Sequence, residues 1–127
     1  MLKKYPFILY VPALVWALFI LLGCLVSPAY IPKPSWSFIG LDKLIHFALF
    51  FIMSATMALI FRHKGMHAYR IAVVTFILSV VYGILVEFLQ MMMRVGREAD
   101  VDDAIANAIG AALFSLLLAA GYRFLRR

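Results

Sequence analysis

Charged residues and cysteine are scarce in this chain. Only 14% of the 127 residues carry a charged side chain, and six are acidic, whereas 66% are hydrophobic. A soluble domain of this length exposes much of its surface to water and could not bury so many apolar side chains. The single cysteine, Cys24, excludes an intramolecular disulfide framework. The composition therefore indicates a protein embedded in lipid.

The few charges leave a basic excess, with a formal net charge of +6. The basic residues flank apolar runs and do not form clusters with aromatic residues. This arrangement favours contact with anionic lipid headgroups over binding of nucleic acid. We therefore predict membrane lipids as partners and no nucleic-acid partner, and the sequence makes no prediction of a homo-oligomer.

Four apolar segments follow one another along the chain. Each has about 20 residues, enough for a helix to cross the hydrocarbon core of a bilayer. They are separated by a proline-rich loop at 27–41, a basic loop at 62–70 and a charged loop at 94–103. We predict an all-α membrane protein, a four-transmembrane-helix bundle that forms one domain over residues 1–127. The predicted helices span about 7–26, 43–61, 71–93 and 104–122.

The distribution of lysine and arginine predicts the orientation of the bundle. The N-terminal tail contains two of these residues, the 62–70 loop three and the C-terminal tail three. The opposite side also contains basic residues, but nearly all of the acidic residues accompany them. Because basic residues in short loops favour the cytoplasmic side, we predict that both termini are cytoplasmic.

The first apolar segment has a second interpretation, as the signal of a lipoprotein. Two lysines, an apolar stretch and the sequence Leu21–Cys24 loosely match such a signal with its cysteine cleavage site. The apolar stretch is longer than a typical signal core, and leucine is unusual immediately before the glycine. We predict that the first helix is retained.

Three polar residues interrupt the apolar segments at the same predicted depth. His46 lies about 6 Å along the second segment from its outer end, at a rise of about 1.5 Å per residue. Glu87 lies about 6 Å below the outer end of the third segment, and Asn107 about 6 Å into the fourth. Ionisable residues inside a membrane are costly and are often functional. The three side chains are therefore predicted to meet in the outer third of the membrane.

Residues predicted just above that level have structural explanations as well as functional ones. Asp42, and either Asp102 or Asp103, would cap the N-termini of the second and fourth helices. Two arginines, Arg94 and Arg97, would anchor the end of the third helix at the headgroups.

Within the apolar segments, Gln90 and Asn107 would form hydrogen bonds between helices. Glu87 is harder to explain in this way, because a carboxylate at that depth must be paired, protonated or in contact with water. Ser79 and Gly83 continue its helical face inward. A stripe of small residues on the fourth segment also predicts close helix packing. These residues are Ala104, Ala108, Ala111, Ser115 and Ala119.

Three short motifs resemble those of a known family. They are Asp42-Lys43-Leu44-Ile45-His46-Phe47, then Glu87-Phe88-Leu89-Gln90, then Arg97 followed by Asp100, Asp103, Asn107 and Gly110. In this order they resemble the motifs of the VanZ-like family of small bacterial membrane proteins. That family takes its name from a protein linked to low-level resistance to the glycopeptide teicoplanin. The resemblance therefore implies a protein of the bacterial inner (cytoplasmic) membrane with a role near the cell envelope, and it implies no established reaction.

The motifs and the predicted depths point to one site at the outer leaflet. In the first hypothesis a non-enzymatic envelope protein uses this site to bind a lipid headgroup, a lipid-linked cell-wall precursor or an amphiphilic glycopeptide antibiotic. Arg94 and Arg97 would hold a phosphate or carboxylate, and no cofactor or metal is predicted. The predicted ligand-binding residues are Asp42, Lys43, His46, Glu87, Gln90, Arg94, Arg97, Asp100, Asp103 and Asn107.

The alternative hypothesis is a membrane-embedded hydrolase or transferase that acts on a lipid-linked substrate. His46 and Glu87 would be the acid and the base, and Asp42 or Asp103 would orient the imidazole. No serine or cysteine has an evident base partner, so a covalent mechanism is not predicted. A metal-assisted variant would hold a divalent ion with His46, Glu87 and Asp103, and Asp42 is a further candidate ligand. A transporter is disfavoured, because the site lies away from the midplane and no inverted repeat is present.

Overall fold

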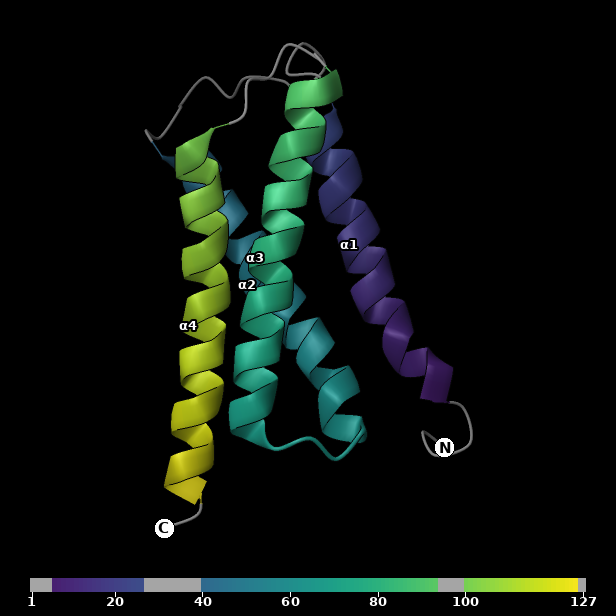
Figure 1. The fold of residues 1–127 in the computed structure, drawn as a ribbon, viewed down its shortest axis with the longest axis vertical. Helices are drawn as coiled ribbons and strands as arrows, with labels where there is room; N and C mark the ends of the chain where they lie inside the picture. Colours follow the sequence, from purple (N-terminus) through teal and green to yellow (C-terminus); the bar gives the residue numbers. More distant parts are fainter. Residues whose placement is uncertain (1–5, 27–39, 94–99, 126–127) are drawn as a thin grey trace.

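The computed structural model describes residues 6–26, 40–93 and 100–125, and helices account for nearly all of them (Figure 1). A short 3-10 helix, η1 (Pro6–Leu9), leads into the first α-helix. The four α-helices, the first together with η1, are long and apolar enough to cross a membrane. The prediction of an all-α protein with four spans is therefore confirmed. The α-helices are α1 (Tyr10–Leu25), α2 (Leu41–His63), α3 (Ala68–Met93) and α4 (Val101–Leu125).

The connection between α2 and α3 is shorter than predicted. The sequence suggested a basic loop at 62–70, but only residues 64–67 separate the two helices. Exposed polar side chains do not interrupt a helix, whereas Gly65, with a φ of 74°, does. The N–H of Met66 donates to the carbonyl of Phe61 at 3.1 Å, as in the Schellman motif that commonly ends helices.

The N-caps predicted for α2 and α4 are wrong. α2 begins after Gly40, which has a φ of 94° and no side chain to cap the helix, and Asp42 lies within the first turn. Asp100 caps α4, because its Oδ1 accepts a hydrogen bond from the N–H of Asp102 at 2.8 Å. The carboxylate of Asp103 is therefore available for contacts with other helices.

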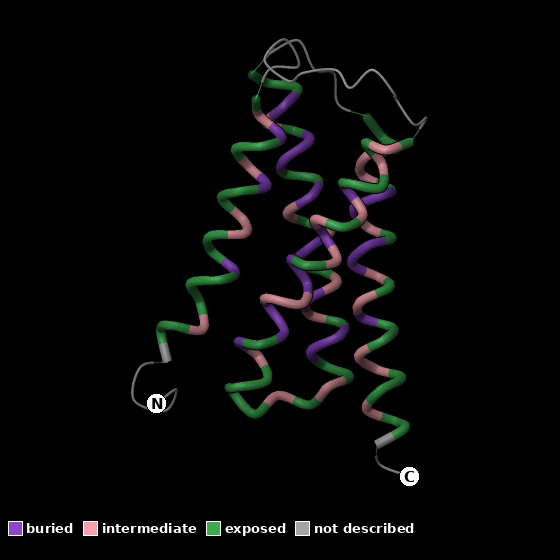
Figure 2. Tube along the Cα trace, turned by 180° about the vertical axis from the view of Figure 1, so that it is seen from behind, coloured by how far each residue is buried: buried purple, intermediate pink, exposed green. Residues whose placement is uncertain are grey.

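α2, α3 and α4 pack closely together, and α1 lies against α2 and α3 (Figure 1). Buried residues line the facing sides of the helices, and exposed residues face outward (Figure 2). Apolar side chains such as Ile20, Phe50 and Val86 are fully buried in this core. α1 is also held by three side chains that donate to backbone carbonyls: Trp16 to Leu49 at 2.9 Å, Tyr82 to Ala17 at 2.6 Å and Gln90 to Cys24 at 2.8 Å.

α4 approaches α2 so closely that position 110 has no room for a side chain. A β-carbon on Gly110 would overlap the carbonyl oxygen of Phe47. Ala111 and Ser115 from the predicted small-residue stripe are also buried. The close packing predicted for the fourth helix is confirmed at these positions, and Gly110 contacts the backbone of α2.

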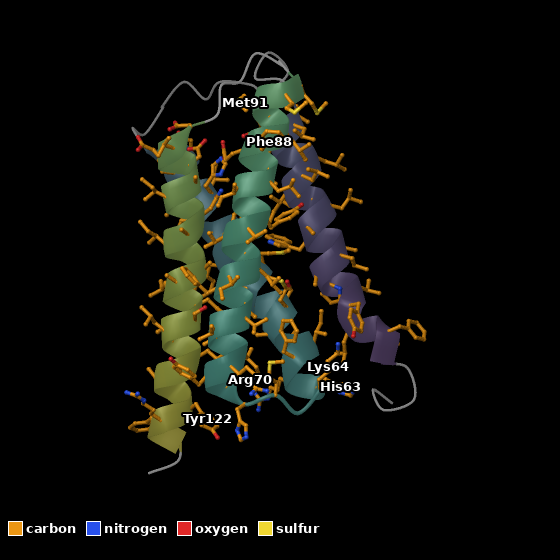
Figure 3. The ribbon with its side chains drawn as sticks, in the orientation of Figure 1. His63, Lys64, Arg70, Phe88, Met91 and Tyr122 are labelled. Carbon is orange, nitrogen blue, oxygen red and sulfur yellow. The ribbon has the colours of Figure 1, made fainter. Side chains whose placement is uncertain are left out.

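The two ends of the bundle differ in chemistry. α1 begins, α4 ends and the α2–α3 connection lies at one end (Figure 1). The basic side chains of His63, Lys64 and Arg70 gather there, at the opposite end from Met91 (Figure 3). α2 begins, α3 ends and α4 begins at the other end, which holds the acidic residues of the described chain. The cytoplasmic location of both termini remains a prediction.

Candidate functional site

The acidic end of the bundle holds the described residues that were predicted from the sequence to form the site. Three helices reach it, because α2 and α4 begin there and α3 ends there (Figure 1). Arg94 and Arg97 lie outside the described residues. The others are Asp42, Lys43 and His46 on α2, Glu87 and Gln90 on α3, Asp100 just before α4, and Asp103 and Asn107 on α4.

His46 is buried, and both of its ring nitrogens lie near side chains of α4. Nδ1 lies 3.1 Å from Oδ1 of Asn107, and Nε2 lies 3.4 Å from Oδ2 of Asp103. Residues four positions apart share a helical face, so α4 presents Asp103 and Asn107 to the same ring. The imidazole is therefore oriented at both nitrogens.

Glu87 completes the cluster from α3. It is only 7% exposed, and its Oε2 accepts a hydrogen bond from the backbone N–H of Asp100 at 3.3 Å. Its Oε1 is buried and has no hydrogen-bond partner among the described residues. Ligand atoms of His46, Glu87 and Asp103 all lie within 4.8 Å of one another. An imidazole beside two carboxylates can transfer protons or bind a divalent cation.

Lys43 is surrounded by carboxylates. Its Nζ lies 2.5 Å from Oδ1 of Asp103, 2.6 Å from Oδ2 of Asp100 and 3.2 Å from Oδ2 of Asp42. These contacts join the start of α2 to the start of α4. The hydrogen bond from Lys43 lowers the pKa of Asp100 below its ordinary value, and the backbone N–H of Asp102 adds to this effect. The ammonium is therefore already neutralised and is not a free cation for a phosphate.

Gln90 faces a different neighbour from Glu87. Its amide donates to the carbonyl of Cys24 on α1, so it forms one of the hydrogen bonds between helices that the sequence analysis considered. Three residues advance a helix by about 300°, which leaves Gln90 about 60° around α3 from Glu87. This angle is enough for the two side chains to contact different helices.

A protein-family model described as VanZ/LLP1 matches residues 7–122. The chain belongs to the VanZ/LLP1 family. The resemblance seen in its motifs is confirmed, and membership together with the four spans makes it a multi-pass membrane protein. No curated protein and no solved structure matches the chain.

Gly83 lies below the polar cluster of this VanZ/LLP1 protein, and it is not part of the three motifs. A β-carbon on Gly83 would lie 3.2 Å from the ring of Phe50 and 3.3 Å from Nδ2 of Asn107. Gly83 precedes Glu87 by four residues, and this spacing is the sequence signal that places it directly below the carboxylate. Its missing side chain leaves room for Asn107 under the imidazole.

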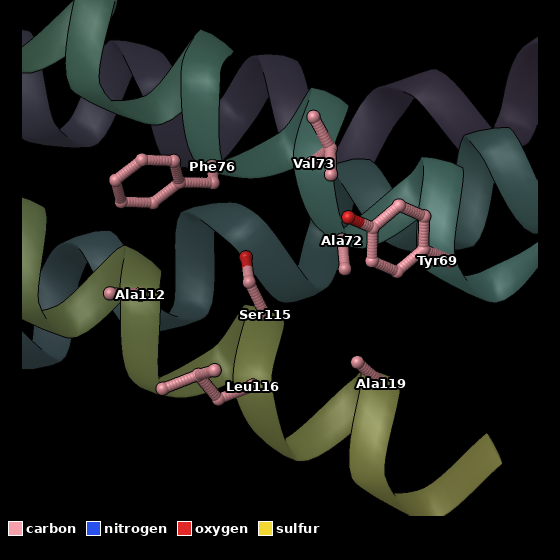
Figure 4. A pocket seen from close by; sticks show the side chains of 8 residues that line it. All are labelled: Tyr69, Ala72, Val73, Phe76, Ala112, Ser115, Leu116 and Ala119. Atoms are coloured by element: carbon pink, nitrogen blue, oxygen red, sulfur yellow. The ribbon is translucent and has the colours of Figure 1, made fainter. Parts of the chain in front are cut away.

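A hollow of about 280 Å³ lies between α3 and α4 of the VanZ/LLP1 bundle (Figure 4). Tyr69 in its wall belongs to the first turn of α3, so the hollow lies toward the basic end. Its walls include Tyr69, Phe76 and Leu116, together with Ser115. None of the residues that line it is charged. This hollow is therefore separate in place and in chemistry from the acidic cluster.

Proposed function

We propose that this protein lies in the bacterial inner membrane, at the cell envelope, and binds the polar headgroup of an amphiphile at the outer end of its bundle. The ligand would be a lipid headgroup, a lipid-linked cell-wall precursor or an amphiphilic glycopeptide antibiotic. The observation that carries the proposal is that two buried polar atoms, Oε1 of Glu87 and Nδ2 of Asn107, have no hydrogen-bond partner among the described residues. An unpaired buried polar group costs about 1–3 kcal/mol. A ligand that pairs such atoms would recover that cost.

The exposure of the surrounding residues supports access from the membrane surface. The side chain of Asp103 is 18% exposed, and those of Asp42 and Asp100 at the rim are far more exposed. A headgroup could therefore reach the buried carboxylate and imidazole from above. The apolar part of the same molecule would lie along α3, where Phe88 and Met91 are exposed at this end (Figure 3).

The charge of the cluster limits the ligand chemistry. Four carboxylates face one ammonium among the described residues, those of Asp42, Glu87, Asp100 and Asp103 against that of Lys43. Such a site favours hydroxyl and amine donors of a ligand, as found on sugars and peptides. Direct contact with phosphate would depend on Arg94 and Arg97, which remain the predicted anion contacts.

A second function, a hydrolase or transferase that acts on a lipid-linked substrate, is favoured by the position of His46. The ring lies beside the carboxylates of Glu87 and Asp103, all within 4.8 Å. Asn107 orients the ring through Nδ1. A carboxylate beside an oriented imidazole is an arrangement that supports general acid–base catalysis.

The ligands that co-purify with the protein test the proposal. The full chain and three variants, Glu87→Gln, Asp103→Asn and the control Asp102→Asn, would be purified in mild detergent and their bound lipids identified by mass spectrometry. Asp102 is exposed and next to Asp103, so it controls for the loss of one negative charge at the same helix end. We expect the wild type and the control to carry the same enriched amphiphile.

The two site variants should bind that amphiphile about tenfold more weakly, which corresponds to about 1.4 kcal/mol. Identical lipid content in all four proteins would refute the proposal. Incubation with a polyprenyl-linked phosphate distinguishes the second function, because turnover that Glu87→Gln abolishes while binding persists would identify an enzyme.

A further inference from the structure

The orientation of His46 leaves an electron pair facing two carboxylates. Oδ1 of Asn107 can only accept a hydrogen bond, so Nδ1 of His46 donates to it across 3.1 Å. In the neutral ring, Nε2 then carries the lone pair. This nitrogen lies 3.4 Å from Oδ2 of Asp103, which also can only accept when ionised. Two acceptors at this distance repel each other unless a proton or a metal ion lies between them.

Glu87 adds a third acceptor from the opposite side of the cluster. Its Oε1 is buried and unpaired among the described residues, although Oε2 is held by the N–H of Asp100. The two oxygens of Asp103 also have different partners. Oδ1 accepts from the ammonium of Lys43, and Oδ2 lies beside the imidazole of His46. With the ring neutral, each of the three residues therefore keeps one atom that no donor of the described residues reaches.

We infer that His46, Glu87 and Asp103 bind one divalent transition-metal ion, with Zn²⁺ as the reference ion. Two carboxylates neutralise the charge of a divalent ion, and the imidazole favours Zn²⁺ over Mg²⁺ or Ca²⁺. Atoms bound to one Zn²⁺ at about 2.0–2.2 Å lie about 3–4 Å apart. The separation of 3.4 Å between Nε2 of His46 and Oδ2 of Asp103 already lies in this range.

The surroundings hold each ligand as metal sites require. Metal-binding histidines usually donate their second N–H to a carbonyl or carboxylate, and Asn107 accepts from His46 in this way. Lys43 and the N–H of Asp100 fix the two carboxylates from different directions. The ligands come from three helices, so the ion would also join the spans at this end.

The ion deepens the proposed function, and this part of the inference rests on that function. Three protein ligands leave one position of a tetrahedral zinc site open. An ion there would attract the anionic part of a headgroup, a phosphate or a carboxylate, into a cluster that otherwise repels anions. The ligand class is then an anionic amphiphile whose charged group contacts the metal.

Metal loading of the purified full-length chain tests the inference. Protein in detergent would be stripped with EDTA, titrated with Zn²⁺ in a calorimeter, and its metal content measured by mass spectrometry. We expect one Zn²⁺ per chain, and much weaker binding of Mg²⁺ and Ca²⁺. Changes to groups that only orient metal ligands cost about 10–100-fold in affinity. Glu87→Gln and Asp103→Asn should lose at least that much, whereas Asp102→Asn should bind like the wild type.

An X-ray absorption spectrum of the wild type loaded with Zn²⁺ does not depend on whether a variant folds. It should show one imidazole in a shell of nitrogen and oxygen ligands at about 2.0–2.2 Å. A sulfur ligand, a protein that takes up no zinc, or equal affinity in Asp103→Asn and Asp102→Asn would overturn the inference.

Headgroup binding separates the inference from the proposed function. Anionic amphiphile binding that EDTA abolishes and Zn²⁺ restores would support both. Amphiphile binding that is indifferent to metal would overturn the role of the ion in headgroup binding and leave the proposed function standing. Zinc bound by the three residues without any amphiphile would overturn the proposed function alone.

Discussion

An alanine at Gly110 should force α4 away from α2. The added β-carbon would overlap the carbonyl oxygen of Phe47 and press on the carbonyl carbon behind it. These are backbone atoms of a helix, so they cannot rotate aside as a flexible side chain would. Overpacking of this kind costs up to about 3 kcal/mol. Alanine recovers about 1 kcal/mol through its higher helix propensity than glycine, which leaves a net loss of about 2 kcal/mol.

The matched control for this variant is Gly121→Ala on the same helix. A β-carbon on Gly121 meets nothing within 4 Å, so this change should be neutral or stabilising by up to about 1 kcal/mol. Both variants would be unfolded by denaturant in detergent micelles beside the wild type. Gly110 is three residues from Asn107, so a displaced α4 should also weaken zinc binding by the same protein.

The comparison of the two variants decides whether the close approach is real. Gly110→Ala should be less stable than Gly121→Ala by about 3 kcal/mol, the overpacking cost alone. Equal stabilities would mean that α2 and α4 are farther apart at Phe47 than the structure has them. The contacts of His46 with α4 would then lose their basis as well.

Three further predictions concern the ends of the bundle. In a chain with Cys24→Ser, the variant Lys64→Cys should resist an impermeant thiol reagent added outside the cell, because the α2–α3 connection is predicted to be cytoplasmic; labelling of intact cells would reverse the topology. Glu87→Gln should melt near the wild type, since an amide oxygen can still accept the N–H of Asp100, whereas Glu87→Leu should lose about 1–3 kcal/mol by orphaning that donor; equal melting of both would contradict this. Lys43 lowers the pKa of Asp100, so the stability it adds is present above the ordinary value of 3.8 and disappears as pH falls through the lowered folded value. Asp100→Asn can still cap the helix, and its deficit relative to wild type should therefore shrink in acid; an unchanged deficit would exclude the ion pair as its cause.

Helix number and the shared level of the polar residues could be predicted from the sequence, because both follow from simple geometry. Apolar runs of about 20 residues define spans, and the fixed rise per residue places His46, Glu87 and Asn107 at one level. The structure brings His46 close to both other helices at that level. What those residues bind remains a prediction.

The partners of each side chain could not be predicted, because they depend on how helices cross. Asp102, Asp103 and Asp100 are equally plausible caps by residue type, and only the backbone path selects Asp100. Lys43 is 57 and 60 residues from two of its carboxylate partners, so no local pattern could pair them. The distance of α4 from α2 is set at Gly110, a position that looks like any other helical glycine in the sequence.

Polar groups that only hold helices together pair with each other, and this bundle contains such a pair. The hydroxyls of Ser54 and Ser79 join α2 to α3 at 2.8 Å and are fully buried. The outer cluster is arranged differently, because Oε1 of Glu87 is unpaired among the described residues and Nε2 of His46 faces a carboxylate.

If the cluster served only to join the spans, a side chain whose polar atoms all form hydrogen bonds could replace Glu87. That replacement would make the bundle more stable. Instead, glycines just below it, at 83 and 110, bring three helices close enough to place three acceptors within 4.8 Å. Packing that close brings two carboxylates beside one imidazole, and a bound metal ion or a proton would offset their repulsion. The ion that we infer would pair these acceptors, whereas the glycines at 83 and 110 account for the close approach of the helices.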